Sequence, residues 1–299
     1  LVDSADLSLN ISREVLQHDY QLKLIAKNIE KKIKNELAKL LKTDRDKYIK
    51  FFEAFGSQLK LGVYADFGRH SDELKDLLMF YSSTEKRLVT LGEYVDRMKD
   101  EQTSILYACG ETIDKIDMLP QADSLKDKGY EVLYLTEGID EFALKMLQRY
   151  KEKDFANICA DDVDLDTQEE KDAINKENET AKDMLDFMKE SLDGAVQSVR
   201  FTNKLKNHPV CLTSEGDVSV EMEKVLNTLP GEENKVKAQI VLEINAEHPV
   251  AQKLKALYDS DKNKVADYAR ILYSVARLIG GMSVENPTEL SNLVCDLMV

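Results

Sequence analysis

Apolar residues recur at the three- and four-residue spacing of amphipathic helices over the first hundred residues of this chain. The spacing predicts one long helix over residues 19–42 and a second helix over residues 48–61 that ends at Gly62. A third helix is predicted to be capped by Ser71, and a fourth to start at Thr90. This part of the chain is therefore expected to be helical.

The pattern changes between residues 101 and 160. Short apolar runs at 105–109, 130–135 and 155–159 predict buried strands, and helical stretches lie between them. Alternation of strands and helices is typical of a small parallel sheet with crossover helices.

Acidic residues dominate residues 161–178, which predicts a linker that runs into a helix ending near Leu192. Beyond it the pattern predicts strands over 195–202 and 209–213, and helices over 218–229, from His248, over 262–279 and over 287–298. The elements together predict a helix-rich fold of mixed α+β and α/β class. It consists of a helical segment, a small three-layer α/β subdomain and a C-terminal α+β domain that ends in a dimerising helix pair.

Composition narrows the class of protein. Hydrophobic residues make up 43% of the 299 residues, which is enough for packed cores. The net charge of -15 repels phosphate backbones, so we expect no nucleic-acid partner. Residues 21–50 depart from this balance with a basic excess, which is either a solvated helix face or a surface beside an anionic ligand. No apolar run approaches the roughly 20 residues of a membrane helix, so no membrane partner is expected.

Cysteine and histidine spacing argues against a metal site. The 4 cysteines form no C-x-x-C pair, and the 4 histidines show no metal-ligand spacing. Unpaired cysteines favour a reducing, cytoplasmic location. The chain begins without an initiator Met or a signal sequence, so we expect it to be a piece of a longer protein.

Several stretches resemble one chaperone family. Residues 2–17 read V-D-S-A-D-L-S-L-N-I-S-R-E-V-L-Q, similar to the V-D-S-x-D-L-x-L-N-x-S-R-E-x-L-Q of the ninety-kilodalton heat-shock chaperones, called HtpG in bacteria. Further landmarks follow in order: L-G-E-Y-V-D-R-M at 91–98, V-L-Y-L-T at 132–136, I-D-E-F at 139–142 and L-E-I-N at 242–245. Val218 stands where eukaryotic members carry Trp, so the chain resembles the bacterial type.

The resemblance implies a homodimer in which each protomer has an N-terminal ATPase domain, a middle domain and a C-terminal dimerisation domain. It divides this chain into the end of the large middle-domain subdomain (1–42), a helical connector (43–100), a small α/β middle subdomain (101–160), an acidic linker (161–178) and the dimerisation domain (179–299). ATP and Mg belong to the family's N-terminal domain. This chain alone is therefore expected to bind no cofactor and to be inactive.

The resemblance also implies a nucleotide contact. In the family, the Arg of S-R-E-x-L-Q reaches the γ-phosphate of ATP on the N-terminal domain, which makes Arg13 the main candidate. A guanidinium is permanently charged, and its fork of donors fits phosphate oxygens, so it can stabilise the closed state or the charge that develops in phosphoryl transfer. Gln17 lies four residues further on the same helical face and is expected to donate a second hydrogen bond. Without the resemblance, Arg13 would be interpreted as a solvated helix residue.

The helix over residues 218–229 is the second candidate site. Its apolar stripe consists of Val218, Met222, Val225, Leu226 and Leu229. The family presents this helix into the cleft between protomers, which implies a surface that holds partly folded client proteins. Methionine suits such binding because its side chain adapts to many shapes. The alternative is that the stripe packs against the domain's own sheet.

The last two helices are the candidate dimer interface. Their apolar positions at helical spacing are Val265, Ala269, Leu272, Val275, Ala276, Ile279, Leu290, Leu293, Val294 and Leu297. Two such helices from each protomer would form a four-helix bundle. The alternative is that these stripes close a core within one chain.

The leading hypothesis is a dimeric client-binding part of a chaperone that supplies Arg13 to the ATPase domain. The alternative is a dimeric scaffold without nucleotide coupling. A self-contained enzyme is disfavoured, because the sequence contains no phosphate loop or catalytic grouping.

Overall fold

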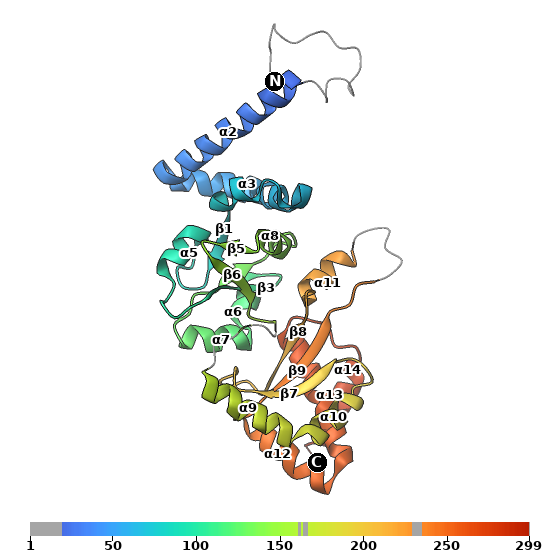
Figure 1. The fold of residues 1–299 in the computed structure, drawn as a ribbon. Helices are drawn as coiled ribbons and strands as arrows, with labels where there is room; N and C mark the ends of the chain where they lie inside the picture. The colour runs from blue at the N-terminus through green and yellow to red at the C-terminus, as the bar shows by residue number, and fades with distance from the viewer. Residues whose placement is uncertain (1–19, 161–162, 164–166, 229–234, 299) are drawn as a thin grey trace. The chain divides into compact units, whose positions relative to one another are not determined.

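The computed structural model describes residues 20–160, 163, 167–228 and 235–298. The chain divides into two compact units, Leu1–Met79 and Phe80–Val299 (Figure 1). Among the described residues, no helix combines the length and the apolar character that a membrane span requires.

Two long helices, α2 (Tyr20–Thr43) and α3 (Arg45–Tyr64), make up most of the first unit. Asp44 caps α3, because its side chain accepts a hydrogen bond at 3.1 Å from a backbone N–H of the first turn. Short helical turns follow: η1 (Ala65–Gly68), α4 (Ser71–Leu74) and η2 (Lys75–Leu77). The buried hydroxyl of Tyr48 donates to the Leu77 carbonyl at 2.6 Å and so ties these turns to α3.

Two helix boundaries in this unit differ from the prediction. α3 passes through Gly62 instead of ending there. A Cβ at Gly62 would lie 3.0 Å from Leu74 Cδ1, so the glycine permits a close approach between two helices. Ser71 is the first residue of α4 and not its cap, and the N-cap residue His70 makes no side-chain capping bond.

The second unit begins with a six-stranded sheet in the order β2-β1-β4-β3-β6-β5. Its strands are β1 (Met79–Ser82), β2 (Leu88–Thr90), β3 (Ser104–Cys109), β4 (Leu133–Leu135), β5 (Arg149–Tyr150) and β6 (Lys153–Asn157). β3 runs parallel to its neighbours β4 and β6, which confirms the predicted parallel sheet. β1 and β5 extend the sheet as antiparallel strands on either side.

Helices cover both faces of this sheet (Figure 1). They are α5 (Leu91–Arg97), α6 (Ile113–Asp117), α7 (Pro120–Asp127) and α8 (Asp140–Leu147). Successive strand residues point to opposite faces. Leu106 packs with Ile116 of α6, whereas the neighbouring Tyr107 reaches Glu141 of α8. The predicted α/β layering is thus present.

Three short strands are absent from the prediction. β1 and β2 lie within residues 43–100, where only helices are predicted, and β5 lies in the helical stretch predicted between the strands at 130–135 and 155–159. Runs of 4, 3 and 2 residues are too short to show a strand period. α8 ends at Leu147 because Gln148 adopts a φ of 60°, which a helix cannot continue.

A three-stranded sheet forms the C-terminal part of this unit, in the order β7-β9-β8. Its strands are β7 (Ser198–Thr202), β8 (Val210–Glu215) and β9 (Gln239–Asn245). The helices of this part are α9 (Gln168–Thr180), α10 (Lys182–Glu190), α11 (Val220–Leu226), α12 (Pro249–Ser260), α13 (Lys262–Ile279) and α14 (Pro287–Asp296). One apolar cluster joins the sheet to α10, α12 and α13. The helix-rich α+β class predicted from the sequence is confirmed.

The central strand β9 is the main element that the sequence pattern did not predict. It pairs with β7 in parallel and with β8 in antiparallel fashion. Its last five residues are all buried, so both faces are covered and the strand lacks the alternation of a half-exposed strand. Glu243 also interrupts its apolar run. This carboxylate is nevertheless buried, where Arg200 of β7 donates to it at 2.9 Å.

The predicted acidic linker is largely helical. Residues 168–178 belong to α9, which starts with a capping box between Thr167 and Glu170 and buries none of its residues. A break at Ala181 separates α9 from α10, where one continuous helix is predicted.

Candidate functional site

A buried carboxylate anchors the start of helix α11. Ser219 caps the helix by accepting a hydrogen bond from the Met222 N–H at 3.1 Å, and its hydroxyl donates to Glu141. Glu141 is 4% exposed and also accepts from the Tyr107 hydroxyl at 3.1 Å and the Asn157 amide at 2.9 Å. Three donors thus satisfy one buried acid, which fixes the start of α11 against the α/β sheet.

The other end of α11 is also held. The Asn227 side chain exchanges two hydrogen bonds with the Val236 backbone, at 2.9 and 3.1 Å. Glu223 accepts a hydrogen bond from the Ala238 N–H at 2.7 Å. The helix therefore presents a defined face despite its short length.

The apolar stripe predicted on this helix is divided between interior and surface. Met222 is buried. Val225 is half-buried and lies against Gly138, where a Cβ would come 3.0 Å from Val225 Cγ2. Leu226 is half-buried as well.

Two further residues of the predicted stripe lie outside the helix as described. α11 covers Val220–Leu226 and is shorter than the predicted range 218–229. Val218 precedes the N-cap and is half-buried, and Leu229 lies outside the described residues.

The stripe predicted for dimerisation on α13 faces two directions. Val265, Ala269, Leu272 and Ala276 are buried in the chain's own core. Helix α13 packs them against the C-terminal sheet, so they are not available to a second chain. Val275 and Ile279 are half-buried, and Val275 also packs against this core.

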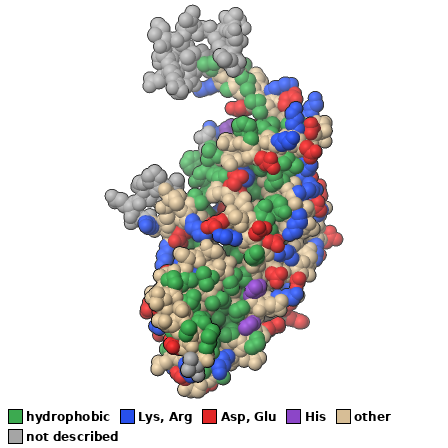
Figure 2. Space-filling view, turned by 180° about the vertical axis from the view of Figure 1, so that it is seen from behind, with side chains coloured by type: hydrophobic (Ala, Val, Ile, Leu, Met, Phe, Trp, Pro, Cys, Tyr) green, Lys and Arg blue, Asp and Glu red, His purple; other side chains and the backbone are tan. Residues whose placement is uncertain are grey.

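Helix α14 buries none of its residues. Leu290, Leu293 and Val294 are half-buried, and Leu297 is 44% exposed. Figure 2 shows hydrophobic side chains at the surface of one face of the molecule, with charged side chains along one edge. An apolar seam on α14 therefore remains accessible.

The predicted nucleotide contacts, Arg13 and Gln17, lie outside the described residues. The basic segment 21–50 falls mainly on α2, where most lysines are exposed and Lys32 pairs with Glu36 at 2.9 Å. In the described part of the chain, no three or more His, Cys, Asp or Glu side chains are grouped to hold a metal ion.

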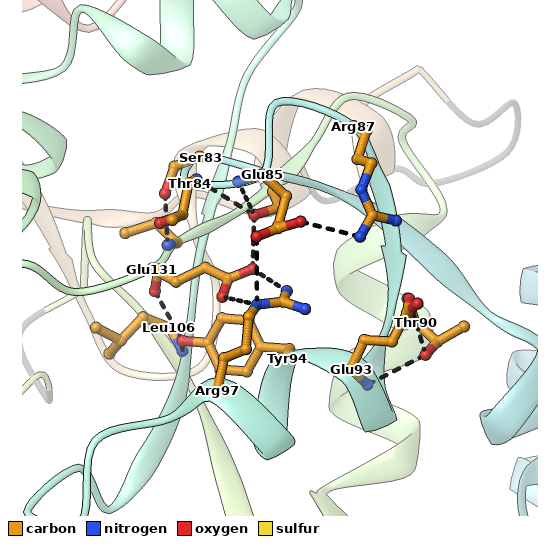
Figure 3. A network of polar contacts seen from close by, with 12 residues as sticks. Ser83, Thr84, Glu85, Arg87, Thr90, Glu93, Tyr94, Arg97, Leu106 and Glu131 are labelled. Atoms are coloured by element: carbon orange, nitrogen blue, oxygen red, sulfur yellow. Dashed lines mark hydrogen bonds and ion pairs between the residues drawn. The ribbon is translucent and has the colours of Figure 1, made fainter.

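The landmark at residues 91–98 stabilises the fold (Figure 3). Glu93 and Thr90 form a capping box at the start of α5. Tyr94 is fully buried, and its hydroxyl donates to the Glu131 carbonyl at 2.8 Å and accepts from the Leu106 N–H at 3.0 Å. Burial raises the pKa of Tyr94 far above its usual range, so the hydroxyl stays protonated.

An ion pair completes this network. Arg97 donates to both carboxylate oxygens of Glu131, at 3.0 and 2.6 Å. Hydrogen bonding to Glu131 raises the pKa of Arg97 further, so the guanidinium remains charged. The pair holds α5 to the chain that enters β4 (Figure 3).

The sequence alone did not single out the Ser219–Glu141 contact. Glu141 lies within the I-D-E-F landmark, and Ser219 directly precedes an apolar periodic segment, which is the usual signal of an N-cap. Spacing along the chain cannot show that two residues 78 positions apart meet.

Comparison with known proteins identifies the family. The family model described as "Hsp90 protein" matches residues 1–299. The chain is 55% identical over 298 residues to the "Chaperone protein HtpG" of Clostridium botulinum (strain 657 / Type Ba4), covering 100% of this chain and 47% of that relative. It is 54% identical over 299 residues to the protein of the same name from Bacillus subtilis (strain 168), covering 100% of this chain and 48% of that relative.

The chain thus spans about half the length of the curated relatives it matches. A family match along every residue, together with identity above one half to bacterial chaperones, shows that this chain belongs to the Hsp90 family of molecular chaperones.

Proposed function

We propose that this chain is the middle and C-terminal part of an ATP-dependent chaperone that works as a homodimer on partly folded proteins. The observation that carries the proposal is an apolar seam made of Leu290, Leu293 and Val294 on α14 and Leu297 at its C-cap, none of which is fully buried in its own chain. A second copy that pairs its α13 and α14 with these would bury the seam in a four-helix bundle.

The free energy gained by burying this seam is compatible with the cost of forming a dimer. A fully buried Leu or Val contributes about 1.5–3 kcal/mol. Leu290, Leu293, Val294 and Leu297 are already partly covered, so each gains only part of that amount. Summed over both protomers, the gain is comparable with an association cost of about 4–15 kcal/mol.

Light scattering tests the dimer. The wild-type chain is expected at twice its mass of 34.0 kDa. Leu293→Asp combined with Leu297→Asp is expected to give folded monomers, because two charges enter the seam. The matched control is Thr288→Asp with Asn292→Asp, which puts the same charge on the opposite, exposed face of α14 and should remain dimeric. A wild-type chain that is monomeric at micromolar concentration would refute this part of the proposal.

Client binding is assigned to α11 and the residue that precedes it. Support comes from the half-buried Val218, Val225 and Leu226 beside a helix that is fixed at both ends. Leu226→Asp is expected to weaken suppression of client aggregation, and the exposed Thr228→Asp should not. Equal suppression by both variants, with helix content unchanged, would argue against this surface.

Arg13 and Gln17 are assigned to the γ-phosphate of ATP held, with Mg, by the N-terminal domain of the complete protein. The support is the resemblance of residues 2–17 to the family motif. In the full-length protein, Arg13→Ala should lower ATP turnover and ATP-driven closure, and Arg13→Lys should have an intermediate effect because it keeps the charge without the fork. Unchanged turnover and closure would favour the scaffold alternative. We expect this chaperone to act in the cytoplasm.

A further inference from the structure

The outer edge of the C-terminal sheet is covered by a helix and not by a strand. The strand order β7-β9-β8 leaves β7 paired on one side only. On the opposite edge, β8 meets the chain that follows β6, where the Ser214 N–H donates to the Cys159 carbonyl at 3.0 Å. An unpaired strand edge presents N–H and C=O groups that another chain can bind. Helix α9 lies beside this edge of β7 (Figure 1).

One side-chain amide pairs with the backbone of this edge. Alternate residues of β7 direct their N–H and C=O groups to β9, and Phe201 directs its own to the free side. Asn178 of α9 takes both groups: its Oδ1 accepts from the Phe201 N–H at 2.7 Å, and its Nδ2 donates to the Phe201 carbonyl at 3.0 Å. The same Nδ2 donates to the Ile174 carbonyl within α9 at 3.0 Å, which fixes the orientation of the amide.

The amide of Asn178 takes the place of a neighbouring strand. A primary carboxamide carries a carbonyl acceptor and N–H donors, as the backbone does. It therefore supplies Phe201 with the one acceptor and the one donor that a residue of an adjacent strand would supply. Val199 lies two residues earlier and directs its N–H and C=O to the same side. The donors and acceptors of this edge are thus complementary to an extended polypeptide backbone.

Helix α9 is attached to the sheet near its C-terminal end. Besides Asn178, Glu177 forms an ion pair with Lys255 at 2.5 Å, and Ile174 packs partly against the core. None of the residues of α9 is buried, and a break at Ala181 separates it from α10. Elements with few buried apolar contacts open at a lower cost than the core does. The helix can therefore leave the edge while the rest of this part stays folded.

We propose that the edge of β7 is a pairing site for an extended polypeptide segment, and that α9 closes this site with Asn178 as the blocking group. The segment adds to the sheet as a further strand once α9 moves aside, and its backbone then bonds to Phe201 and Val199. Because the pairing uses backbone groups, the site accepts segments of varied sequence, such as partly folded proteins present.

A second copy of this chain fits the edge less well than such a segment does. Its own β7 is closed by its own Asn178, so pairing between copies requires two α9 helices to move at once. An extended segment presents N–H and C=O groups that are already free. The identity of the partner rests on the proposed client-binding function, but the pairing is measured on β7 and α9 and not on α11, so either can fail without the other.

The first test measures peptide binding to variants of the complete chain. The probe is a short fluorescent peptide of alternating threonine and valine with a lysine at each end. Asn178→Ala keeps a good helix former in α9 and removes the blocking amide. It should lower the Kd about threefold to tenfold, the effect of about one hydrogen bond. Asn175→Ala, at an exposed position of the same helix, is the matched control and should bind as the wild type does.

A second peptide separates backbone pairing from side-chain contact. N-methylation of every threonine and valine keeps the side chains but removes the N–H groups from both edges of the peptide. This peptide should bind none of the variants measurably. Equal affinity for the two peptides, or equal Kd values for Asn178→Ala and the wild type, would overturn the proposal.

Hydrogen exchange in the wild-type chain tests the same site without a variant. With saturating unmethylated peptide, the Val199 amide should exchange about threefold to tenfold more slowly and the amides of α9 correspondingly faster. Unchanged exchange at both places would place the peptide elsewhere and refute the site. Light scattering identifies the remaining partner: Asn178→Ala chains that exceed the wild-type mass without peptide would assign the edge to a second copy, against the proposal.

Discussion

At the scale of the residue, Tyr94 shows how one side chain joins several elements. Its hydroxyl donates to the Glu131 carbonyl and accepts from the Leu106 N–H and from the Gln102 amide, at 2.8, 3.0 and 2.9 Å. These partners lie before β4, in β3 and between α5 and β3. The landmark at 91–98 therefore has a physical role that needs no ligand.

Removing this hydroxyl should destabilise the protein. Tyr94→Phe removes the acceptor of the Leu106 N–H and one of the two acceptors of the Gln102 amide, which costs about 1–3 kcal/mol of unfolding free energy. Urea unfolding measures the loss. Tyr20→Phe serves as the control, because Tyr20 is 79% exposed. Equal midpoints for the two variants would contradict the role of the network.

Asp117 predicts a dependence of stability on pH. Burial raises the pKa of Asp117, but hydrogen bonds from Tyr134, Lys126 and Lys86 outweigh it and hold the pKa below its usual value. A carboxyl with a lowered pKa in the folded state stabilises the protein above its unfolded pKa of about 4 and loses that effect as the pH falls through the folded pKa.

Asp117→Asn should therefore lower the melting temperature at pH 7. The difference from the wild type should shrink as the pH falls below about 4, where both side chains become neutral. Thermal melts at a series of pH values measure it. A difference that stays constant down to the lowest pH would show that the charge of Asp117 is not responsible.

At the scale of the element, long periodic helices were predictable and strands much less so. α2, α12, α13 and α14 follow the apolar spacing closely. β9 was not predicted from the sequence. It is buried on both faces and its apolar run is interrupted by Glu243, so its apolar and polar residues do not alternate. The sequence also predicted where α11 lies, but not that Met222 turns inward or that Ser219 is anchored by a distant acid.

The docking of α11 depends on a glycine that faces it. Gly138→Ala would place a Cβ 3.0 Å from Val225 Cγ2, so it should destabilise α11 by about 1–3 kcal/mol. Faster hydrogen exchange in α11 would report this effect. Adding Val225→Ala should restore part of the loss by making room. A double variant whose effects simply add would mean that the two residues do not interact.

At the scale of the whole molecule, α13 contributes buried residues to the core and partly buried residues to a possible contact with a second chain. From the sequence alone, its stripe fitted either a dimer seam or an internal core. The structure buries Val265, Ala269, Leu272 and Ala276 within the chain and leaves Val275 and Ile279 only partly buried. Periodicity reveals an apolar face but not which partner covers it.

Two truncations separate these roles. Removal of residues 284–299 takes away α14 and should give a folded monomer. Removal of residues 262–299 also takes away the core residues of α13 and should unfold the C-terminal part. Losing a single buried Leu costs about 2–5 kcal/mol, against a total stability of about 5–15 kcal/mol. Circular dichroism and light scattering distinguish the outcomes, and a cooperative melt of the shorter chain would contradict the assignment.

The order of strands β7-β9-β8 also bears on how the chain is made. Both outer strands leave the ribosome before the one that joins them, so a nascent chain that has reached Glu215 carries two strands without their partner. The core closes only after α13 has been synthesised. The core of this part therefore closes only once β9 and α13 have both emerged, and until then β7 and β8 expose unpaired edges that favour aggregation.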